Sequence, residues 1–259
     1  MKILFMGRKQ VSANLLRFLT KQDHIEIVGV LTDSHLQGSP TTAAAQELGL
    51  PLYTFDTALE AMREGRLKYD LGLSVLYWRK LRDEFLSIPT LGTINFHPAL
   101  LPEYKGTGGY NLAIMDELNQ WGNTAHYVDA SIDTGEIIEV DRFPIDAETE
   151  TAQSLERKTM QALEDFARRI ITRAIESKTK LPTTPNIGGR YVSRDEMEAM
   201  KQICDGDDIE KKIRAFWFPP YDGAYVEING QKYTLINRQL LEEVAPKDST
   251  SLFAGKANA

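Results

Sequence analysis

The sequence predicts an α/β fold in which a mostly parallel β-sheet is flanked by helices and followed by a small C-terminal helix and β-hairpin module. Up to residue 97, short apolar stretches alternate with helical segments, which is typical of βαβ units and a parallel sheet. A long amphipathic helix, capped by Thr151, is predicted to run to about Glu176. Beyond Ser177 the chain is rich in Pro, Gly and Thr, which indicates a connection between packed elements.

The N-terminal half is expected to alternate strands and helices. The expected strands are residues 2–6, 25–33, 51–53, 70–76 and one that carries Asn95 and His97. The expected helices are 13–22, 43–49, 57–64 and 79–89. We expect Ser12 to cap the first helix, and Thr41 or Thr42 to cap the second. With right-handed crossovers, these elements predict a Rossmann-like sheet.

The remaining elements follow from turn signals and periodicity. Residues 110–114 are predicted to be helical, and 123–131 and 135–145 to form an antiparallel strand pair around the Asp133 loop. Residues 207–216 are a charged helical segment, and Asn229-Gly230 predicts a hairpin turn. We therefore divide the chain into a main domain, residues 1–180, and a C-terminal module and tail, residues 181–259, with the last dozen residues frayed.

Composition limits the function classes. The 259 residues carry a net charge of −7, which disfavours general nucleic-acid binding because that requires clustered Lys and Arg. Cys204 is the single cysteine, so an intramolecular disulfide is excluded and a cysteine-based zinc site is disfavoured. We find no signal-peptide core and no apolar run of the length that spans a bilayer. The expectation is a cytoplasmic protein without membrane contact.

The candidate catalytic residues lie at the end of the strand after Leu91. Asn95 and His97 are two residues apart, so their side chains face the same side of a strand. Pro98 and then Pro102 cannot continue a ladder, and open α/β sheets hold ligands at such strand ends. Asp133 lies in a glycine-containing loop, where a carboxylate can orient an imidazole or hold a proton.

These three groups suit the attack of an amine on a carbonyl. Asn95 would donate a hydrogen bond to the oxyanion, His97 would accept or relay the proton, and Asp133 would set the tautomer and charge of the imidazole. The sequence offers no evident activated Ser or Cys, which favours direct transfer without a covalent enzyme intermediate. This chemistry requires no metal.

The stretch INFHPALLPEYKG (94–106), followed by IDTGEI (132–137), resembles the folate-dependent formyltransferases, which use N10-formyltetrahydrofolate. Asn95, His97 and Asp133 match that family's catalytic trio by position, and the resemblance covers roughly residues 1–175. It implies a pterin site along residues 74–80. The co-substrate contacts that it implies are Leu76, Tyr77, Trp78 and Arg79.

Members of this family differ in the amine that they formylate. Methionyl-tRNA formyltransferases carry a basic, longer loop after the second strand and a larger C-terminal barrel, whereas residues 32–42 here contain no Lys or Arg and the C-terminal module is short. Glycinamide ribonucleotide formyltransferases have a Gly/Ser/Asn phosphate loop after the first strand, and residues 7–16 contain one Gly. Both remain alternatives to the third group, the nucleotide-sugar N-formyltransferases.

The sugar branch fits best, because residues 213–235 resemble its Arg-Ala-Phe…Pro-x-x-Gly-Ala segment. The resemblance then implies folate and a nucleotide-linked aminosugar as partners, a homodimer, and a place in surface polysaccharide (O-antigen) synthesis. Lys105 departs from the commoner Arg, and Thr-Gly-Gly stands where others often have Pro. The candidate residues for the nucleotide sugar are Arg8, Lys9, Tyr104, Lys105, Thr107, Gly108, Gly109 and Tyr110.

Two alternatives are not enzymes. A non-catalytic Rossmann-like dinucleotide-binding module would need G-x-G-x-x-G after the first strand, and GRKQVSAN does not match. A protein-interaction scaffold could use the aromatic residues near Trp217, but it has no reason to combine Asn95, His97 and Asp133. The nucleotide (UDP, dTDP or GDP), the sugar and the position of its amine stay open.

Overall fold

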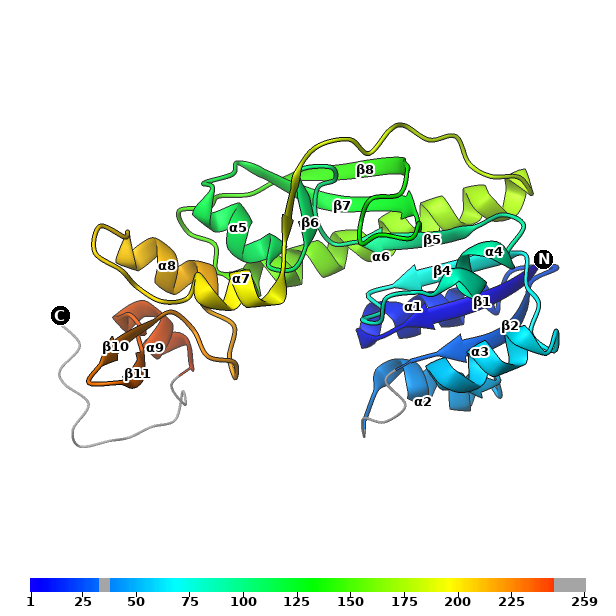
Figure 1. Cartoon of the computed structure of the whole chain (residues 1–259), viewed down its shortest axis with the longest axis horizontal. Helices are drawn as coiled ribbons and strands as arrows, with labels where there is room; N and C mark the ends of the chain where they lie inside the picture. The colour runs from blue at the N-terminus through cyan, green and yellow to red at the C-terminus, as the bar shows by residue number, and fades with distance from the viewer. Residues whose placement is uncertain (33–37, 245–259) are drawn as a thin grey trace.

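The computed structural model describes residues 1–32 and 38–244. Its main feature is a seven-stranded sheet with the order β3-β2-β1-β4-β5-β7-β8, in which β7 runs antiparallel to both of its neighbours and the other strands share one direction (Figure 1). This confirms the predicted fold class. The strands are β1 Lys2–Gly7, β2 Glu26–Leu31, β3 Leu52–Tyr53, β4 Leu71–Val75, β5 Thr93–His97, β7 Gln120–Tyr127 and β8 Ile137–Pro144.

Helices cover both faces of the sheet. On β1, Ile3 and Phe5 belong to one apolar cluster, which α1, α2 and α6 share. Leu4 and Met6 belong to a second cluster, which α3 and α4 share. Since successive side chains of a strand point to opposite faces, a strand buried on both faces is apolar throughout. The helices are α1 Lys9–Leu19, α2 Pro40–Glu47, α3 Phe55–Arg63, α4 Asp83–Ser87, α5 Gly109–Met115 and α6 Ala152–Ser177.

Two predicted helix caps are wrong. α1 begins directly after β1, and Ser12 lies inside it, where its hydroxyl accepts from Arg8 N (3.0 Å) and donates to Val75 O (3.0 Å). The N-cap of α2 is Ser39, because Pro40 takes the first helical position that proline favours. The helix expected over 79–89 is also shorter, since α4 spans Asp83–Ser87.

The long helix begins as predicted. Thr151 and Ser154 form a capping box at the start of α6, which satisfies backbone N–H groups that have no partner within the helix. The buried side of α6 includes Leu155, Leu163 and Phe166, which pack against the sheet and against α5 and α8.

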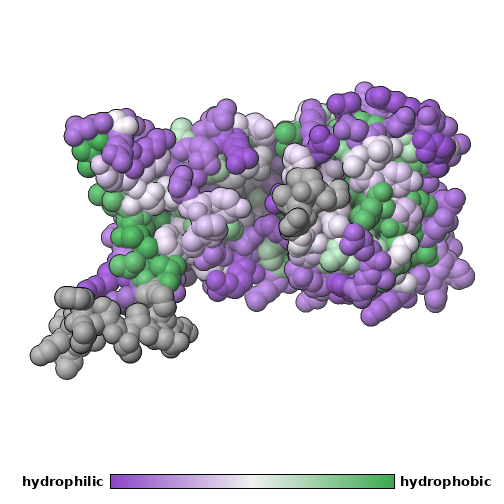
Figure 2. All heavy atoms as spheres, turned by 90° about the horizontal axis from the view of Figure 1, so that it is seen from below, coloured by the Kyte–Doolittle hydropathy of each residue, from purple (hydrophilic) through white to green (hydrophobic). Residues whose placement is uncertain are grey.

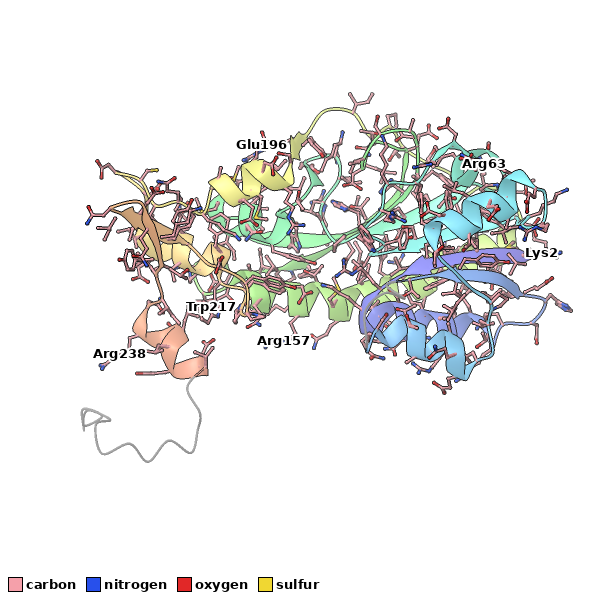
Figure 3. All side chains as sticks on the ribbon, turned by 60° about the horizontal axis from the view of Figure 1, so that its bottom comes forward. Lys2, Arg63, Arg157, Glu196, Trp217 and Arg238 are labelled. Carbon is pink, nitrogen blue, oxygen red and sulfur yellow. The ribbon has the colours of Figure 1, made fainter. Side chains whose placement is uncertain are left out.

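The C-terminal segment contains the predicted helix and hairpin. The helix is α8 Ile209–Phe216, and β10 Tyr225–Ile228 pairs with β11 Gln231–Thr234. Asn229 and Gly230 have φ of 53° and 76°, as a tight hairpin turn requires. Trp217 follows α8, and its carbonyl accepts from Gln153 N (3.1 Å) at the start of α6 (Figure 3).

Three features were not predicted from the sequence, namely a parallel pair between β6 Tyr104–Gly106 and β9 Arg190–Val192, helix α7 Arg194–Ala199 and helix α9 Arg238–Val244. The hairpin and the helices around it lie at the opposite end of the molecule from the N-terminus (Figure 1). One apolar cluster joins Ala113 and Trp121 to Ala215 and Phe216, so residues on both sides of position 180 share a core. The domain boundary at residue 180 stays a prediction.

Two predicted features lie wholly or partly outside the described residues. The frayed tail falls within 245–259, and the non-basic loop after β2 falls partly within 33–37. Among the described residues, no helix combines the length and apolarity that a membrane span needs.

The capping box at α6 gives a stability prediction. Thr151→Ala should lower the free energy of unfolding by about 1 kcal/mol, because an Ala cap leaves a helix N–H unsatisfied. We expect the melting temperature to fall by roughly 2–4 °C in a chain of this size. Thr179→Ala, an exposed position just beyond the end of α6, is the control, and an equal fall in both variants would contradict the role of the cap.

Candidate active site

Asn95 and His97 lie at the carboxyl end of β5 and share one face of the sheet. Ile94 and Phe96, which alternate with them, belong to the apolar cluster under α1 and α6, so Asn95 and His97 point to the opposite side. The neighbouring parallel strand, β4, ends beside them, with Ser74 opposite Asn95. This is the sheet edge at which open α/β folds bind ligands.

Each ring nitrogen of His97 faces an oxygen atom. Its Nε2 lies 2.9 Å from the carbonyl oxygen of Tyr104, and its Nδ1 lies 3.6 Å from Oδ2 of Asp133. Because a carbonyl oxygen only accepts, Nε2 carries the proton of the neutral ring and Nδ1 presents its lone pair toward Asp133. The Tyr104 carbonyl therefore fixes the tautomer, a role that was predicted for Asp133.

The Asp133 loop is tightly constrained. Asp133 has φ of 55°, in the left-handed region, which is less unfavourable for Asp than for most residues. Its Oδ2 accepts from the N–H of Gly106 (2.9 Å). A Cβ at Gly135 would lie 1.7 Å from Tyr127 O, and one at Gly106 would lie 2.3 Å from Val192 O. Glycine is therefore required at both positions, which explains the glycines of the two sequence motifs.

His126 completes the cluster and was missed. It lies on β7 directly opposite Asn95 in the antiparallel ladder. Its Nδ1 is 2.8 Å from Tyr127 O, its Nε2 is 3.0 Å from Nδ2 of Asn95 and 3.6 Å from Oδ1 of Asp133. Since Nδ1 must donate to the carbonyl, Nε2 of the neutral ring accepts from Asn95. The strand pattern over 123–131 puts His126 in a strand, but nothing in the sequence says which strand lies opposite.

Burial and charge set the protonation states. Burial lowers the pKa of His97 and outweighs the opposite effects of Asp133 and the Tyr104 carbonyl. Burial alone would raise the pKa of Asp133, but His97, His126 and the Gly106 N–H together lower it to about 2. Near neutral pH the site therefore combines an ionised Asp133, a neutral His97 with an available lone pair, and the Asn95 amide. Such a set can accept a proton and donate a hydrogen bond to a carbonyl oxygen.

The predicted co-substrate residues follow β4 and lie at the same sheet edge. Leu76 has φ of 58°, and it packs with Tyr77 against the cores on either side. Trp78 is 53% exposed. The Arg79 guanidinium lies 4.6 Å from the centroid of the Phe55 ring and 5.2 Å from that of Trp78. The structure therefore brings Leu76–Arg79 close to the strand end of His97, while their contact with a ligand stays a prediction.

Arg8 and Lys9 follow β1, the next strand along this edge. The N–H of Arg8 donates to Val75 O (3.3 Å). Lys9 forms an ion pair with Glu156 of α6. Both residues therefore lie at the carboxyl edge of the sheet. The ammonium group of Lys9 is already paired with the Glu156 carboxylate.

Tyr104 and Lys105 serve the structure around the site. The Tyr104 hydroxyl donates to Asp116 (3.1 Å), and burial, aided by Asp116, raises its pKa to about 12. Lys105 is 9% exposed, and its Nζ donates to the carbonyl of Gly188 (2.7 Å). The ammonium group therefore binds the connection between α6 and β9.

Thr107 to Tyr110 join β9 to α5. The N–H and hydroxyl of Thr107 both donate to Val192 O, at 2.9 and 3.1 Å. Gly108 caps α5 with φ of 77°, Gly109 starts the helix, and the Tyr110 ring packs 6.3 Å from Trp121. Their part in substrate binding stays a prediction.

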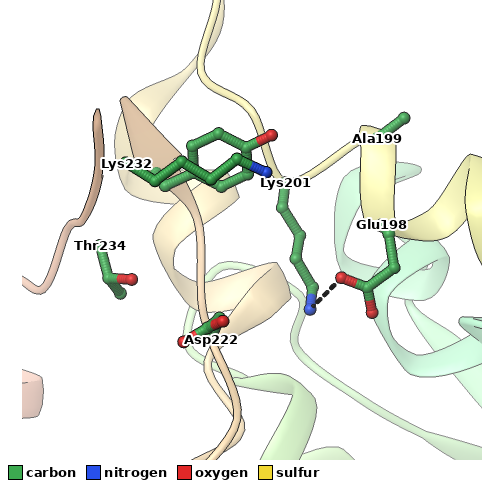
Figure 4. A pocket seen from close by; sticks show the side chains of 7 residues that line it. Glu198, Ala199, Lys201, Asp222, Lys232 and Thr234 are labelled. Atoms are coloured by element: carbon green, nitrogen blue, oxygen red, sulfur yellow. Dashed lines mark ion pairs between the residues drawn. The ribbon is translucent and has the colours of Figure 1, made fainter. Parts of the chain in front are cut away.

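A separate cavity of about 350 Å³ lies between α7 and the hairpin and contains none of the predicted site residues. Lys201, Glu198, Asp222 and Lys232 are among the side chains that line it (Figure 4). Lys201 pairs with Glu198 at 2.8 Å. In the described part of the chain, no group of three or more His, Cys, Asp and Glu side chains is arranged to hold a metal ion.

Comparison with known proteins gives consistent matches. A family model described as formyl transferase matches residues 1–172. A methionyl-tRNA formyltransferase of Lysinibacillus sphaericus is 29% identical over 241 residues, which cover 86% of this chain and 74% of that protein.

Solved structures also match. A 4-N formyltransferase from Francisella tularensis has a TM-score of 0.74 at 20% identity, covering 90% of this chain and 96% of that chain. An N-formyltransferase from Helicobacter canadensis, solved with folinic acid and dTDP-3-aminofucose, has a TM-score of 0.70 at 25% identity, covering 90% and 86%.

The pKa of His97 gives a test of the site's protonation. Because the folded pKa lies below the unfolded value of about 6.5, the unfolded chain binds more protons as the pH falls. Stability should therefore decrease between about pH 7.5 and 5.5, while Asp133 stays ionised. In urea unfolding, His97→Asn should show a smaller decrease than the parent, whereas the exposed-site control His24→Asn should not. Equal pH slopes in the parent and His97→Asn would refute the buried neutral imidazole.

Proposed function

The chain belongs to the formyl transferase family, and on that premise we propose that it transfers the formyl group of N10-formyltetrahydrofolate to the amine of a nucleotide-linked amino-deoxysugar. The observation that carries this proposal is the neutral His97, whose Nδ1 lone pair lies beside the ionised Asp133, with the Asn95 amide on the same face. A general base with a pKa below ambient pH suits a reaction in which an amine loses a proton as it attacks.

The proposed steps use these three side chains. The neutral amine nitrogen attacks the formyl carbon, and a C–N bond forms while the carbonyl electrons move to oxygen. An Asn95 N–H donates to this oxyanion. His97 Nδ1 takes the amine proton, and the resulting imidazolium is stabilised by Asp133. The carbonyl then re-forms as the C–N10 bond breaks, N10 receives the proton held by His97, and tetrahydrofolate leaves.

His126 supports Asn95 in this proposal. One Asn95 N–H is used in the hydrogen bond to His126 Nε2 (3.0 Å), which fixes the plane of the amide. The second N–H is then directed by that plane and serves the oxyanion. The same nitrogen lies 3.6 Å from Oδ1 of Asp133.

Folate is the proposed co-substrate. The Helicobacter canadensis neighbour was solved with folinic acid, and Leu76–Arg79 follow the strand adjacent to β5. Backbone groups of Leu76 and Tyr77 would bind the pterin, and the exposed Trp78 and Arg79 would border it.

The aminosugar is the proposed acceptor, and methionyl-tRNA is the second candidate. The dTDP-3-aminofucose of the Helicobacter neighbour and the net charge of −7 support the sugar. The 29% identity to a methionyl-tRNA formyltransferase favours tRNA. For the sugar, Arg8 and Lys9 would face the diphosphate, and Tyr104, Lys105 and Thr107–Tyr110 would border it. Lys9 would exchange Glu156 for a phosphate.

Cytoplasmic location and a homodimer stay predictions. Apolar side chains gather on the C-terminal module beside α9 (Figure 2). In this module Ile228, Leu241 and Val244 are about half exposed. Light scattering of the purified protein would measure its mass and decide between one copy and two.

His97→Asn should lower kcat by about 10²–10⁴-fold, as expected for loss of a general base, with little change in KM. Asp133→Asn should have a similar effect. Initial rates of formyl transfer measure both, and His24→Asn, far from the site, is the matched control. Near-parental turnover in His97→Asn would remove His97 from the mechanism.

The acceptor prediction is tested by a screen. The protein is incubated with N10-formyltetrahydrofolate and UDP-, dTDP- or GDP-linked aminosugars, initiator methionyl-tRNA or glycinamide ribonucleotide. We expect mass spectrometry to detect a formylated nucleotide sugar. Formylation of methionyl-tRNA alone, with the steep salt dependence of a polyanion, would replace the sugar proposal.

A further inference from the structure

The connection between α6 and β9 runs along the loop that carries Asp133. Thr184 and Ile137 exchange two backbone hydrogen bonds, of 2.9 and 2.8 Å. Further on, the N–H of Arg190 donates to Glu103 O (2.9 Å). Residues 184–190 are therefore fixed both to the strand that follows the Asp133 loop and to the chain just beyond His97.

Asn186 lies between these two fixed points, and its side chain binds the Asp133 loop. The amide nitrogen Nδ2 donates to the carbonyl of Asp133 (3.0 Å) and to that of Gly135 (2.9 Å). Because both partners are carbonyl oxygens, the nitrogen of the amide must face them. One side chain thus uses both of its N–H groups on the two ends of a three-residue turn.

This turn needs an external support. Asp133 has φ of 55°, and a non-glycine residue in that region persists when its surroundings fix it. The Gly106 N–H holds the carboxylate (2.9 Å), while Asn186 holds the backbone of the same residue. The carboxylate and the main chain are therefore fixed from two different segments.

We propose that Asn186 is a positioning residue, which holds the backbone of Asp133 so that its carboxylate stays beside Nδ1 of His97 during formyl transfer. The catalytic part of this inference rests on the proposed function. Asn186 itself acts through Asp133.

The effect of Asn186 on stability is expected to be small. Its Oδ1 is buried and has no hydrogen-bond partner among the described residues. An unpartnered buried acceptor is unfavourable by an amount comparable to the gain from two neutral hydrogen bonds. The two contributions largely cancel, so the main consequence of this side chain is the geometry of the loop.

The site is sensitive to that geometry. The carboxylate of Asp133 lies 3.6 Å from both His97 and His126, and a misplacement of about 1 Å can lower a rate by about 100-fold. The titratable groups that face His97 are Asp133 and His126. If Asp133 moves away, the imidazolium of His97 loses its main stabilising charge, and the pKa of His97 falls further.

The test compares Asn186→Ala and Asn186→Leu, which keeps the branch at Cγ without the amide, with the control Thr183→Val. Thr183 lies on the same connection, but its hydroxyl donates to the exposed side chain of Glu136 (3.0 Å). We expect both Asn186 variants to lower kcat by about 10–100-fold with KM little changed, and the control to keep the parental rate. In an Asp133→Asn background, the Asn186 substitutions should have almost no further effect, because the group they position is already lost.

An NMR titration of the His97 ring provides a readout without any substrate. The pKa of His97 should be lower in both Asn186 variants than in the parent and unchanged in Thr183→Val. If the parent protein formylates no acceptor, the proposed function fails, and this titration still decides the role of Asn186. An unchanged His97 pKa, parental kcat in the Asn186 variants, or an equal loss in the Asp133→Asn background would each overturn the positioning role.

Discussion

A carboxylate enclosed between two imidazoles organises this end of the sheet. Removing an ionised carboxylate from water costs several kcal/mol unless charges and hydrogen bonds compensate. Oδ2 of Asp133 accepts from the Gly106 N–H at the end of β6, and the carboxylate lies beside His97 on β5 and His126 on β7, which together hold its pKa at about 2 against the effect of burial. The carboxylate therefore stays charged only while these segments keep their distances, and the surrounding fold serves that requirement.

This constraint explains several local features together. The left-handed backbone at Asp133 turns its side chain back toward β5, and glycine at 135 lets the loop lie against the end of β7. Because residue 106 is glycine, β9 can lie close to β6, and the N–H of Gly106 points at the Asp133 carboxylate. Each of these residues belongs to a turn or a strand end. Together they set the distance between the His97 imidazole and the Asp133 carboxylate.

The sequence predicted correctly those features that depend only on residues close together along the chain. The spacing of Asn95 and His97 determines a shared strand face, Thr151 determines the start of α6, and Asn229-Gly230 determines a hairpin turn, and all three appear as predicted. The resemblance to formyltransferases over the first two thirds of the chain is confirmed by the family match.

Residues whose role depends on non-local pairing could not be predicted in this way. His126 joins the site because β7 pairs with β5, and no local signal specifies that pairing. The hydrogen bond from Lys105 to the carbonyl of Gly188 joins residues 83 positions apart, and no local signal indicates it. Asn186 lies in a stretch whose composition indicates only a connection, and its partners are backbone atoms that carry no sequence signal. Ser12 was misassigned because its hydroxyl bonds to the end of a distant strand, Val75.

The close approach of Gly189 to Pro102, where an added Cβ would lie 1.5 Å from the carbonyl oxygen, has a consequence for building chimeras. Composition alone suggests exchanging C-terminal modules between relatives at residue 180. However, the chain from Thr184 to Val192 is hydrogen-bonded to the N-terminal part along most of its length. A crossover point after β9 would exchange the C-terminal module and leave residues 184–192, which border the site, in place. A crossover at residue 180 would exchange the module and these residues together.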